Sequence, residues 1–147
     1  MRFHCICFWG SSSMMKDILI AQKSVIMSMF GLDSRCSCKE YFRQYNIMTV
    51  YDLYIYELLE YIHANKSKFS IGSDFHIYNT RYKSNFVVPL HQLSTYNRTL
   101  MVQGIKLYNR LTDNMKQMTE MNNFKNCVKK IILGVCPYSF NEFVQTL

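Results

Sequence analysis

The stretch 49-TVYDLYIYELLEYIHAN-65 carries the strongest structural signal in the chain. Thr49 and Asp52 stand three positions apart at its start, which is the spacing of a capping box that opens a helix. The apolar residues that recur at the spacing of one helix face are Tyr51, Ile55, Leu58, Leu59 and Ile62. The pattern therefore predicts a helix that ends near Asn65 and buries this face in the core.

Two further helices are expected upstream of this one. Residues 11–13 are all serine and offer an N-cap for a helix that runs to about Phe30, with Gly31 as its C′ residue. The apolar face of this helix is expected to contain Met15, Ile18, Leu19, Gln22, Ile26 and Met29. A short helix is expected over residues 38–45.

Helical spacing resumes downstream with Leu100, Leu107 and Leu111. Gly104 lies inside this pattern, where it costs about 1 kcal/mol relative to alanine. We therefore expect Gly104 to mark a close contact between two helices.

Two helices are expected in the last quarter of the chain. Residues 121–133 have helical spacing, and their predicted buried side chains are Phe124, Val128, Ile131 and Ile132. The other face of that helix carries Lys125, Lys129 and Lys130. Ser139 and Glu142 have the spacing of a capping box for a terminal helix over residues 140–146.

The segment 66–95 differs from the helical segments on either side. Ser, Asn, Lys and Tyr dominate it, and the apolar period disappears apart from a short extended piece at residues 86–89. We expect a long polar, basic loop here, and loops of this length in a compact domain tend to be functional.

The totals agree with one small helical domain. At 147 residues, of which 49% are hydrophobic, the chain can bury one core and is not expected to be disordered. Its 2 Pro and 5 Gly are too few for a turn-rich β-sandwich. The sequence therefore predicts a mainly α fold: a single domain, residues 1–147, with about five or six helices and the long loop.

The positive charge is unevenly placed along the chain. The net charge is +7, and residues 75–112 contain five basic residues and no acidic one. Such a segment suits an anionic partner, with nucleic acid as the first candidate and an acidic membrane surface as the second. An ordinary solvated face on a basic protein remains open as an alternative.

One cluster in the loop has the side chains that single-stranded nucleic acid requires. It is Asp74, His76, Tyr78, Asn79, Thr80 and Arg81. A tyrosine can stack on a base, an arginine can hold a phosphate and an asparagine can bond a base edge. The alternative is that these side chains bond the backbone of the loop itself. The predicted nucleic-acid contacts are His76, Tyr78, Asn79, Arg81, Lys83, Lys106, Arg110, Lys125 and Lys129.

Metal binding and catalysis have weaker support. The pairs Cys5/Cys7 and Cys36/Cys38, with His4 or His63 as further ligands, invite a zinc site, but a gap of one residue is unusual for zinc. Buried free thiols explain these cysteines as well, so we predict no metal and no cofactor.

No signature of a catalytic or phosphate-binding loop occurs in the chain. The acidic residues are scattered singly, except for Glu57 and Glu60, which fit a solvated helix face more simply than a metal site. We therefore expect no catalytic residue and no enzymatic activity.

The sequence contains no convincing secretory signal and no run of about 20 apolar residues that would span a membrane. We expect reduced cysteines, no membrane partner and a cytoplasmic or nuclear protein.

The stretch 74-DFHIYNTR-81 resembles the H-x-YNTR segment near the C-terminus of jockey-like, LINE-type (non-LTR) retrotransposon reverse transcriptases. Other pieces resemble that family in the same order: Trp9-Gly10, the stretch 47-IMTVYDLYIYE-57 and the stretch 104-GIKLYN-109. The resemblance covers almost the whole chain. It implies a segment that follows the polymerase fingers, palm and thumb, with RNA or DNA and the upstream polymerase domain as partners.

The resemblance supplies no catalytic residue, because the metal-binding aspartates of the family lie upstream of the matched region. Two departures are visible. The chain reads 21-AQKSVIM-27 where the family has LQKRAIR, so two arginines are missing, and Thr112 replaces an expected proline. The loss of these arginines weakens any role of the first helix in binding phosphate.

Three hypotheses for function follow. The first is an accessory segment of an RNA-directed DNA polymerase that binds nucleic acid and has no catalytic activity by itself. The second is a structural tail that packs on the polymerase thumb, which predicts an exposed apolar patch around residues 3–9. The third is a non-functional fragment of a decayed element.

Overall fold

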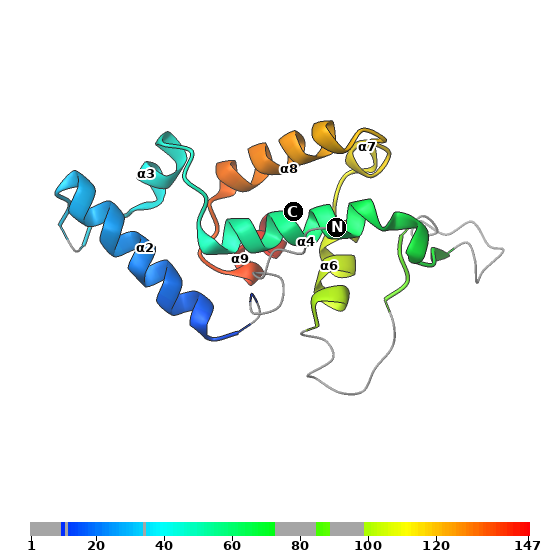
Figure 1. Ribbon diagram of the computed structural model, residues 1–147, viewed down its shortest axis with the longest axis horizontal. Coiled ribbons are helices and arrows are strands. Elements are labelled where there is room, and N and C mark those ends of the chain that lie inside the picture. Colours follow the sequence, from blue (N-terminus) through cyan, green and yellow to red (C-terminus); the bar gives the residue numbers. More distant parts are fainter. Residues whose placement is uncertain (1–9, 11, 34, 73–84, 89–98) are drawn as a thin grey trace.

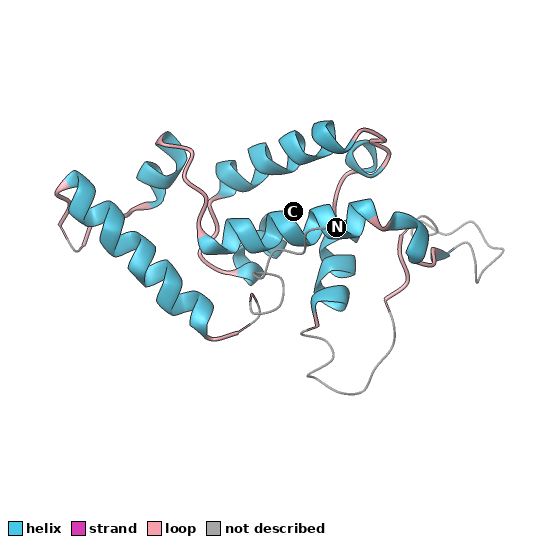
Figure 2. Ribbon diagram, viewed as in Figure 1, coloured by secondary structure: helices cyan, strands magenta, loops and turns pink. Residues whose placement is uncertain are grey.

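The computed structural model describes residues 10, 12–33, 35–72, 85–88 and 99–147 of the chain. The described residues are mainly helical, which confirms the predicted fold class (Figure 2). Their seven α-helices are α2 (Met14–Phe30), α3 (Lys39–Gln44), α4 (Val50–Ala64), α6 (Leu100–Asn109), α7 (Asp113–Lys116), α8 (Met121–Val135) and α9 (Phe140–Thr146). A short 3-10 helix, η1 (Lys66–Lys68), follows α4. Helices α7 and η1 are the two of these elements that the sequence did not predict.

Helix α4 is the centre of the fold, and α2, α6 and α8 all pack on it. Figure 1 shows α8 above α4, α6 below it and α2 beside its N-terminal end. The predicted capping box is present: Asp52 N donates to Thr49 Oγ1 at 3.1 Å, and Thr49 N donates to Asp52 Oδ2 at 2.7 Å. The predicted start and end of this helix are therefore confirmed.

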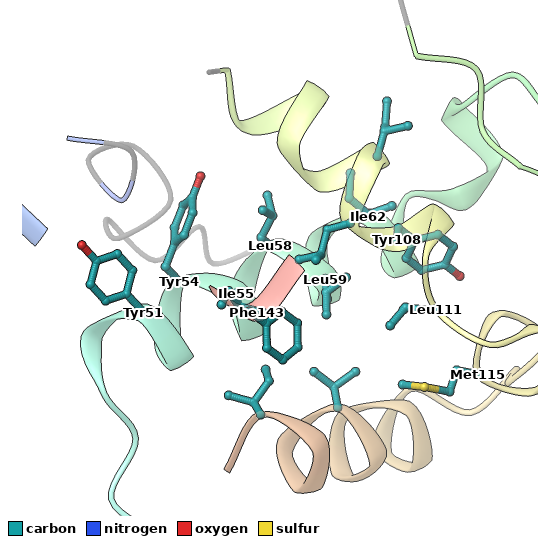
Figure 3. Close-up of a cluster of buried hydrophobic side chains, with 14 of the residues drawn as sticks. Tyr51, Tyr54, Ile55, Leu58, Leu59, Ile62, Tyr108, Leu111, Met115 and Phe143 are labelled. Atoms are coloured by element: carbon teal, nitrogen blue, oxygen red, sulfur yellow. The ribbon is translucent and has the colours of Figure 1, made fainter. Parts of the chain in front are cut away.

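The core forms around the predicted apolar face of α4. Ile55, Leu58, Leu59 and Ile62 are each at most 1% exposed. Figure 3 shows them with side chains contributed by the elements on either side, which include Tyr108, Leu111, Met115 and Phe143. Burying a side chain of this size contributes about 1.5–3 kcal/mol of favourable transfer free energy, so this face is a main part of the hydrophobic core.

Gly104 lies at a close contact between α6 and α4, as its place in the sequence predicts. A Cβ atom at this position would be 2.8 Å from Ile62 Cγ1 and 3.0 Å from Leu58 Cδ1. The missing side chain lets the two helix backbones approach each other, which offsets the low helix propensity of glycine.

Helix α2 begins after Ser13 and ends at Phe30 as predicted. Gly31 has a left-handed φ of 59°, and its N–H donates to the carbonyl of Met27. Met15, Leu19 and Ile26 are buried. Met29 lies on the apolar side of α2, as predicted, but its side chain is 67% exposed. The apolar side of α2 is wider than the surface that α4 and α3 cover.

Gln22 ties α2 to the start of α4. Its Nε2 donates to the carbonyl of Met48 at 3.4 Å, and its Oε1 accepts from Val50 N at 2.8 Å. Val50 N is one of the amide groups in the first turn of α4 that no helix carbonyl can satisfy, so Gln22 supplies a missing partner.

Both described ends of the segment 66–95 are anchored to the core. Of the predicted extended piece at residues 86–89, Phe86 pairs with Ile71 in an isolated antiparallel bridge, and Pro89 lies outside the described residues. Phe86 is 8% exposed, and the Asn109 side chain bonds both its N–H and its carbonyl, at 2.9 and 2.8 Å. Between these anchors, residues 73–84 lie outside the described part of the chain.

The last two helices differ from prediction in detail. Helix α8 extends to Val135, two residues beyond the expected end, and Cys136 ends it with a left-handed φ of 48°. Ser139 Oγ accepts from Glu142 N at 3.1 Å, as a capping box requires. The Glu142 carboxylate instead accepts from Tyr138 N and pairs with Lys39 Nζ, so the reciprocal half of the predicted box is absent.

Candidate nucleic-acid interface

Five of the nine predicted contacts lie outside the described residues. They are His76, Tyr78, Asn79, Arg81 and Lys83. Their roles remain predictions from the sequence. The described candidates are Lys106, Arg110, Lys125 and Lys129, which lie on α6, directly after α6, and on α8.

Lys106 and Arg110 are both exposed at the surface. Arg110 Nη1 donates to the carbonyl of Val144, so this guanidinium also links the end of α6 to α9. Arginine has five N–H donors, and one bond to a carbonyl leaves most of them available to a phosphate.

Lys125 and Lys129 belong to α8, whose N-terminal half lies over α4. Lys125 Nζ is 2.6 Å from Glu60 Oε1, and this hydrogen bond raises the pKa of Lys125. The sequence suggested that Glu60 lies on a solvated helix face. The structure corrects this prediction, because Glu60 pairs with Lys125 and so links α4 to α8. Lys129 is exposed. Of these two lysines, Lys129 is the better placed to contact a ligand.

The structure does not gather these four side chains at one place. Figure 1 shows α6 and α8 on opposite sides of α4. Lys106, inside α6, is therefore separated by the central helix from Lys125 and Lys129 of α8. Arg110 follows the end of α6 and bonds Val144 of α9.

A basic groove that the sequence did not predict lies between α3 and α8. It has a volume of about 320 Å³ and is lined by Arg43, Asn46, Lys130, Leu133 and Gly134. Arg43 Nη2 donates to the carbonyl of Val135 at 2.9 Å. The basic face of α8 was visible in the sequence, but nothing in the spacing indicates that Arg43 packs beside it.

A second groove is apolar and lies along α2. It has a volume of about 410 Å³, and its lining is Ile18, Ala21, Gln22, Val25, Ile26, Met29, Phe42 and Ile47. Val25 is 57% exposed, and Met14, one turn before Ile18 on this side of the helix, is 61% exposed. Such a stripe is typical of a surface that contacts another protein segment.

His63 is the buried residue that most resembles a catalytic group. Its Nδ1 is 3.0 Å from Tyr108 Oη, and its ring stacks on Phe124 with centroids 3.6 Å apart. Burial is the main cause that lowers the pKa of His63 to about 4, and the charge of Lys66 acts in the same direction. Because His63 is 3% exposed and enclosed by aromatic rings, we interpret it as a core residue that holds α4 against its neighbours.

The buried acid and thiols are also structural. Asp52 is fully buried, and this burial raises its pKa to about 6. Burial likewise raises the pKa of Cys136 to about 11, which removes the reactive thiolate at neutral pH. Cys36, Cys38, Cys127 and Cys136 are all free thiols.

Two kinds of site are not found in the described part of the chain. No three His, Cys, Asp or Glu side chains there are grouped so that they could hold a metal ion. None of the helices formed by these residues has both the length and the apolar character needed to cross a membrane.

Comparisons of the chain with protein-family models, with curated proteins and with solved structures found no match.

Proposed function

We propose that this chain is a nucleic-acid-binding accessory segment of a LINE-type, non-LTR reverse transcriptase, and that it has no catalytic activity by itself. The observation that carries the proposal is the charge of two helices. Neither α6 nor α8 contains an acidic residue, and between them they contain Lys106, Lys129 and Lys130, together with Lys125, which pairs with Glu60 of α4. Two helices of this charge on a chain of net charge +7 favour a polyanion as the partner.

The way in which such basic helices bind a polyanion follows from the charge of the phosphate backbone. Each lysine or arginine that neutralises a phosphate releases a condensed counterion, so affinity falls as salt rises. Tyr78 and Asn79 in the basic loop supply base stacking and a base-edge bond in this proposal. The resemblance of the chain to reverse transcriptases makes element RNA or target DNA the partner, in the cytoplasm or the nucleus.

The test is fluorescence anisotropy with a labelled oligouridylate of about 16 nucleotides, the size of a large single-strand site. Between about 50 and 200 mM salt, the affinity of the full chain is expected to fall with a log–log slope of about −0.7 per phosphate contact. The double variant Arg81→Ala/Lys83→Ala should weaken binding about tenfold, which is about 1.4 kcal/mol for the two lost contacts together.

The matched control is Lys16→Ala/Arg35→Ala, which removes the same charge at two exposed positions outside the basic segment. Binding that is absent at low salt would reject the proposal. An equal loss of oligouridylate affinity in both double variants would mean that binding depends on net charge alone and not on Arg81 and Lys83.

A second function is favoured by the apolar groove along α2. In this alternative the chain is a structural tail, and α2 packs on the upstream polymerase domain through Ile18, Val25 and Met29. The predicted patch at residues 3–9 lies outside the described residues, so the groove provides the support.

Val25→Lys tests this alternative, because it places a charge on the groove. Ser24→Lys is its control, since Ser24 is an exposed neighbour that does not line the groove. Co-purification with a co-expressed polymerase thumb should be lost in Val25→Lys and retained in Ser24→Lys. Retention in both variants would exclude the groove as the contact.

A further inference from the structure

We infer that the groove between α3 and α8 binds a phosphate group of a nucleic-acid backbone, an inference that rests on the proposed function. Its polar lining consists of Arg43, Asn46 and Lys130, which are two cations and an amide. No carboxylate lines the groove among the described residues. An anion with several acceptor oxygens suits this set of donors.

Arg43 is oriented before any ligand arrives. Its Nη2 donates to the carbonyl of Val135 at 2.9 Å, which holds the guanidinium against the end of α8. This bond uses one of five N–H donors, and the planar fork keeps the others in fixed geometry for phosphate oxygens. The described residues give Arg43 no salt bridge that would compete with a ligand.

Glu142 is the acidic residue whose charge interacts with Arg43 in this region. Its carboxylate accepts from Tyr138 N at 2.7 Å and pairs with Lys39 Nζ. Burial opposes the ionisation of Glu142, but these bonds hold its pKa below the usual value. Its charge is therefore already matched by Lys39, which leaves Arg43 for an external anion.

The end of α3 places Asn46 beside Arg43. Asn46 has a left-handed φ of 52°, a conformation that asparagine tolerates better than most side chains. Asn46 N donates to the carbonyl of Arg43 at 3.2 Å, so one tight turn positions both side chains. The groove forms where this turn faces Lys130 of α8.

The groove is open to solvent and has room for a phosphodiester, since its volume is about 320 Å³. Asn46, Lys130 and Gly134 are all exposed, so a polymer can enter and leave along the surface. A phosphodiester with its bound water is small enough to sit between the two cations.

Gly134 allows a test that does not depend on removing a structural side chain. A Cβ added at Gly134 meets no atom within 4 Å, so a larger side chain can be placed there without a clash. Gly134→Glu puts a negative charge at the groove, and Gly134→Gln is the neutral control of the same size. With the labelled oligouridylate, Gly134→Glu should bind about tenfold more weakly than Gly134→Gln, with a log–log salt slope shallower by about 0.7.

Lys130→Gln provides a second measurement, with Lys16→Gln as a control for the loss of one charge. Binding should weaken several-fold more in Lys130→Gln than in Lys16→Gln. If Gly134→Glu equals Gly134→Gln, or Lys130→Gln equals Lys16→Gln, while the unmodified chain binds, the groove is not the site. The proposed function then stands without it.

Titration with inorganic phosphate, followed by amide NMR shifts of Asn46 and Gly134, separates free phosphate from a polymer. Shifts with both phosphate and oligouridylate support the inference. Shifts with phosphate alone would make the groove a site for small anions and overturn the nucleic-acid assignment. Absence of both shifts overturns the inference, whatever the anisotropy shows. Absence of oligouridylate binding anywhere on the chain overturns the proposed function as well.

Discussion

Two helical glycines should respond to alanine with opposite changes in stability. Gly104 faces α4, where a Cβ would be 2.8 Å from Ile62 Cγ1 and 3.0 Å from Leu58 Cδ1. Both of those side chains are 0% exposed, so they have little room to move. Gly134 lies in the last turn of α8, where an added Cβ meets nothing within 4 Å.

The expected magnitudes follow from these surroundings. Alanine in place of glycine favours a helix by up to about 1 kcal/mol, and this gain applies to both positions. At Gly104 the forced shift of a packed neighbour costs about 1–3 kcal/mol, which cancels or exceeds the gain. Gly134→Ala should therefore be stabilised by up to about 1 kcal/mol, and the two variants should differ by about 1–3 kcal/mol.

Urea denaturation followed by circular dichroism measures both free energies of unfolding. The denaturant slope should be unchanged, so the difference appears in the midpoint. If Gly104→Ala proved as stable as Gly134→Ala, the close contact between α6 and α4 would be refuted. A lower free energy for Gly134→Ala than for the unmodified chain would refute the open space beside Gly134.

Two buried groups should give the stability opposing pH dependences. In the folded chain His63 stays neutral down to about pH 4, whereas in the unfolded chain it is protonated below about pH 6.5. The contribution of His63 to stability is therefore complete above pH 6.5, and it falls by up to about 1.4 kcal/mol per pH unit as the pH drops. Asp52, with its pKa raised to about 6, contributes stability below about pH 3.8 that is lost as the pH rises through 6. As the pH falls from 6 to 4, the Asp52→Asn variant should therefore lose stability more steeply than the unmodified chain. Urea denaturation at a series of pH values measures this, and an equal change of the unfolding free energy with pH in both proteins would contradict the raised pKa of Asp52. Tyr108→Phe removes the hydroxyl 3.0 Å from His63 Nδ1 and should cost about 1–3 kcal/mol, whereas a loss near zero would mean that the bond is dispensable.

The sequence predicts the helices well because their signals are local. The capping box of α4 depends on Thr49 and Asp52, which are three positions apart, and its bonds form within one turn. Gly31 likewise indicates the end of α2 from the sequence alone, because glycine adopts the left-handed φ without strain. Cys136 ends α8 with the same left-handed conformation, but cysteine is not a typical helix stop, so the end of α8 was placed too early.

The exposure of Met29 shows where periodicity stops being informative. Spacing identifies which residues share a side of α2, but the extent of burial depends on the helices that pack there. The side of α2 that carries Ile18, Val25 and Met29 is apolar and still exposed in part. The Lys125–Glu60 pair could not be predicted for the same reason, because it depends on the packing of α8 on α4 and not on any local pattern.

The basic groove could not be predicted because its two cations come from distant parts of the chain. Arg43 is in α3 and Lys130 is in α8, and only the packing of these helices brings them together. The sequence did identify the lysine face of α8, which supplies half of the groove. A single arginine in the last turn of a short helix carries no functional signal by itself.

Helix α3 separates the apolar groove along α2 from the basic groove where we infer phosphate binding. Phe42 is 1% exposed and lines the apolar groove, while its neighbour Arg43 is exposed and lines the basic groove. A protein segment on α2 and a nucleic-acid strand between α3 and α8 would therefore occupy different sides of α3. Binding nucleic acid and packing on a polymerase are then compatible rather than competing roles. Val25→Lys should abolish co-purification with the polymerase thumb and leave oligouridylate affinity unchanged within twofold, because Val25 does not line the basic groove. A parallel loss of both would show that the two grooves form one coupled surface.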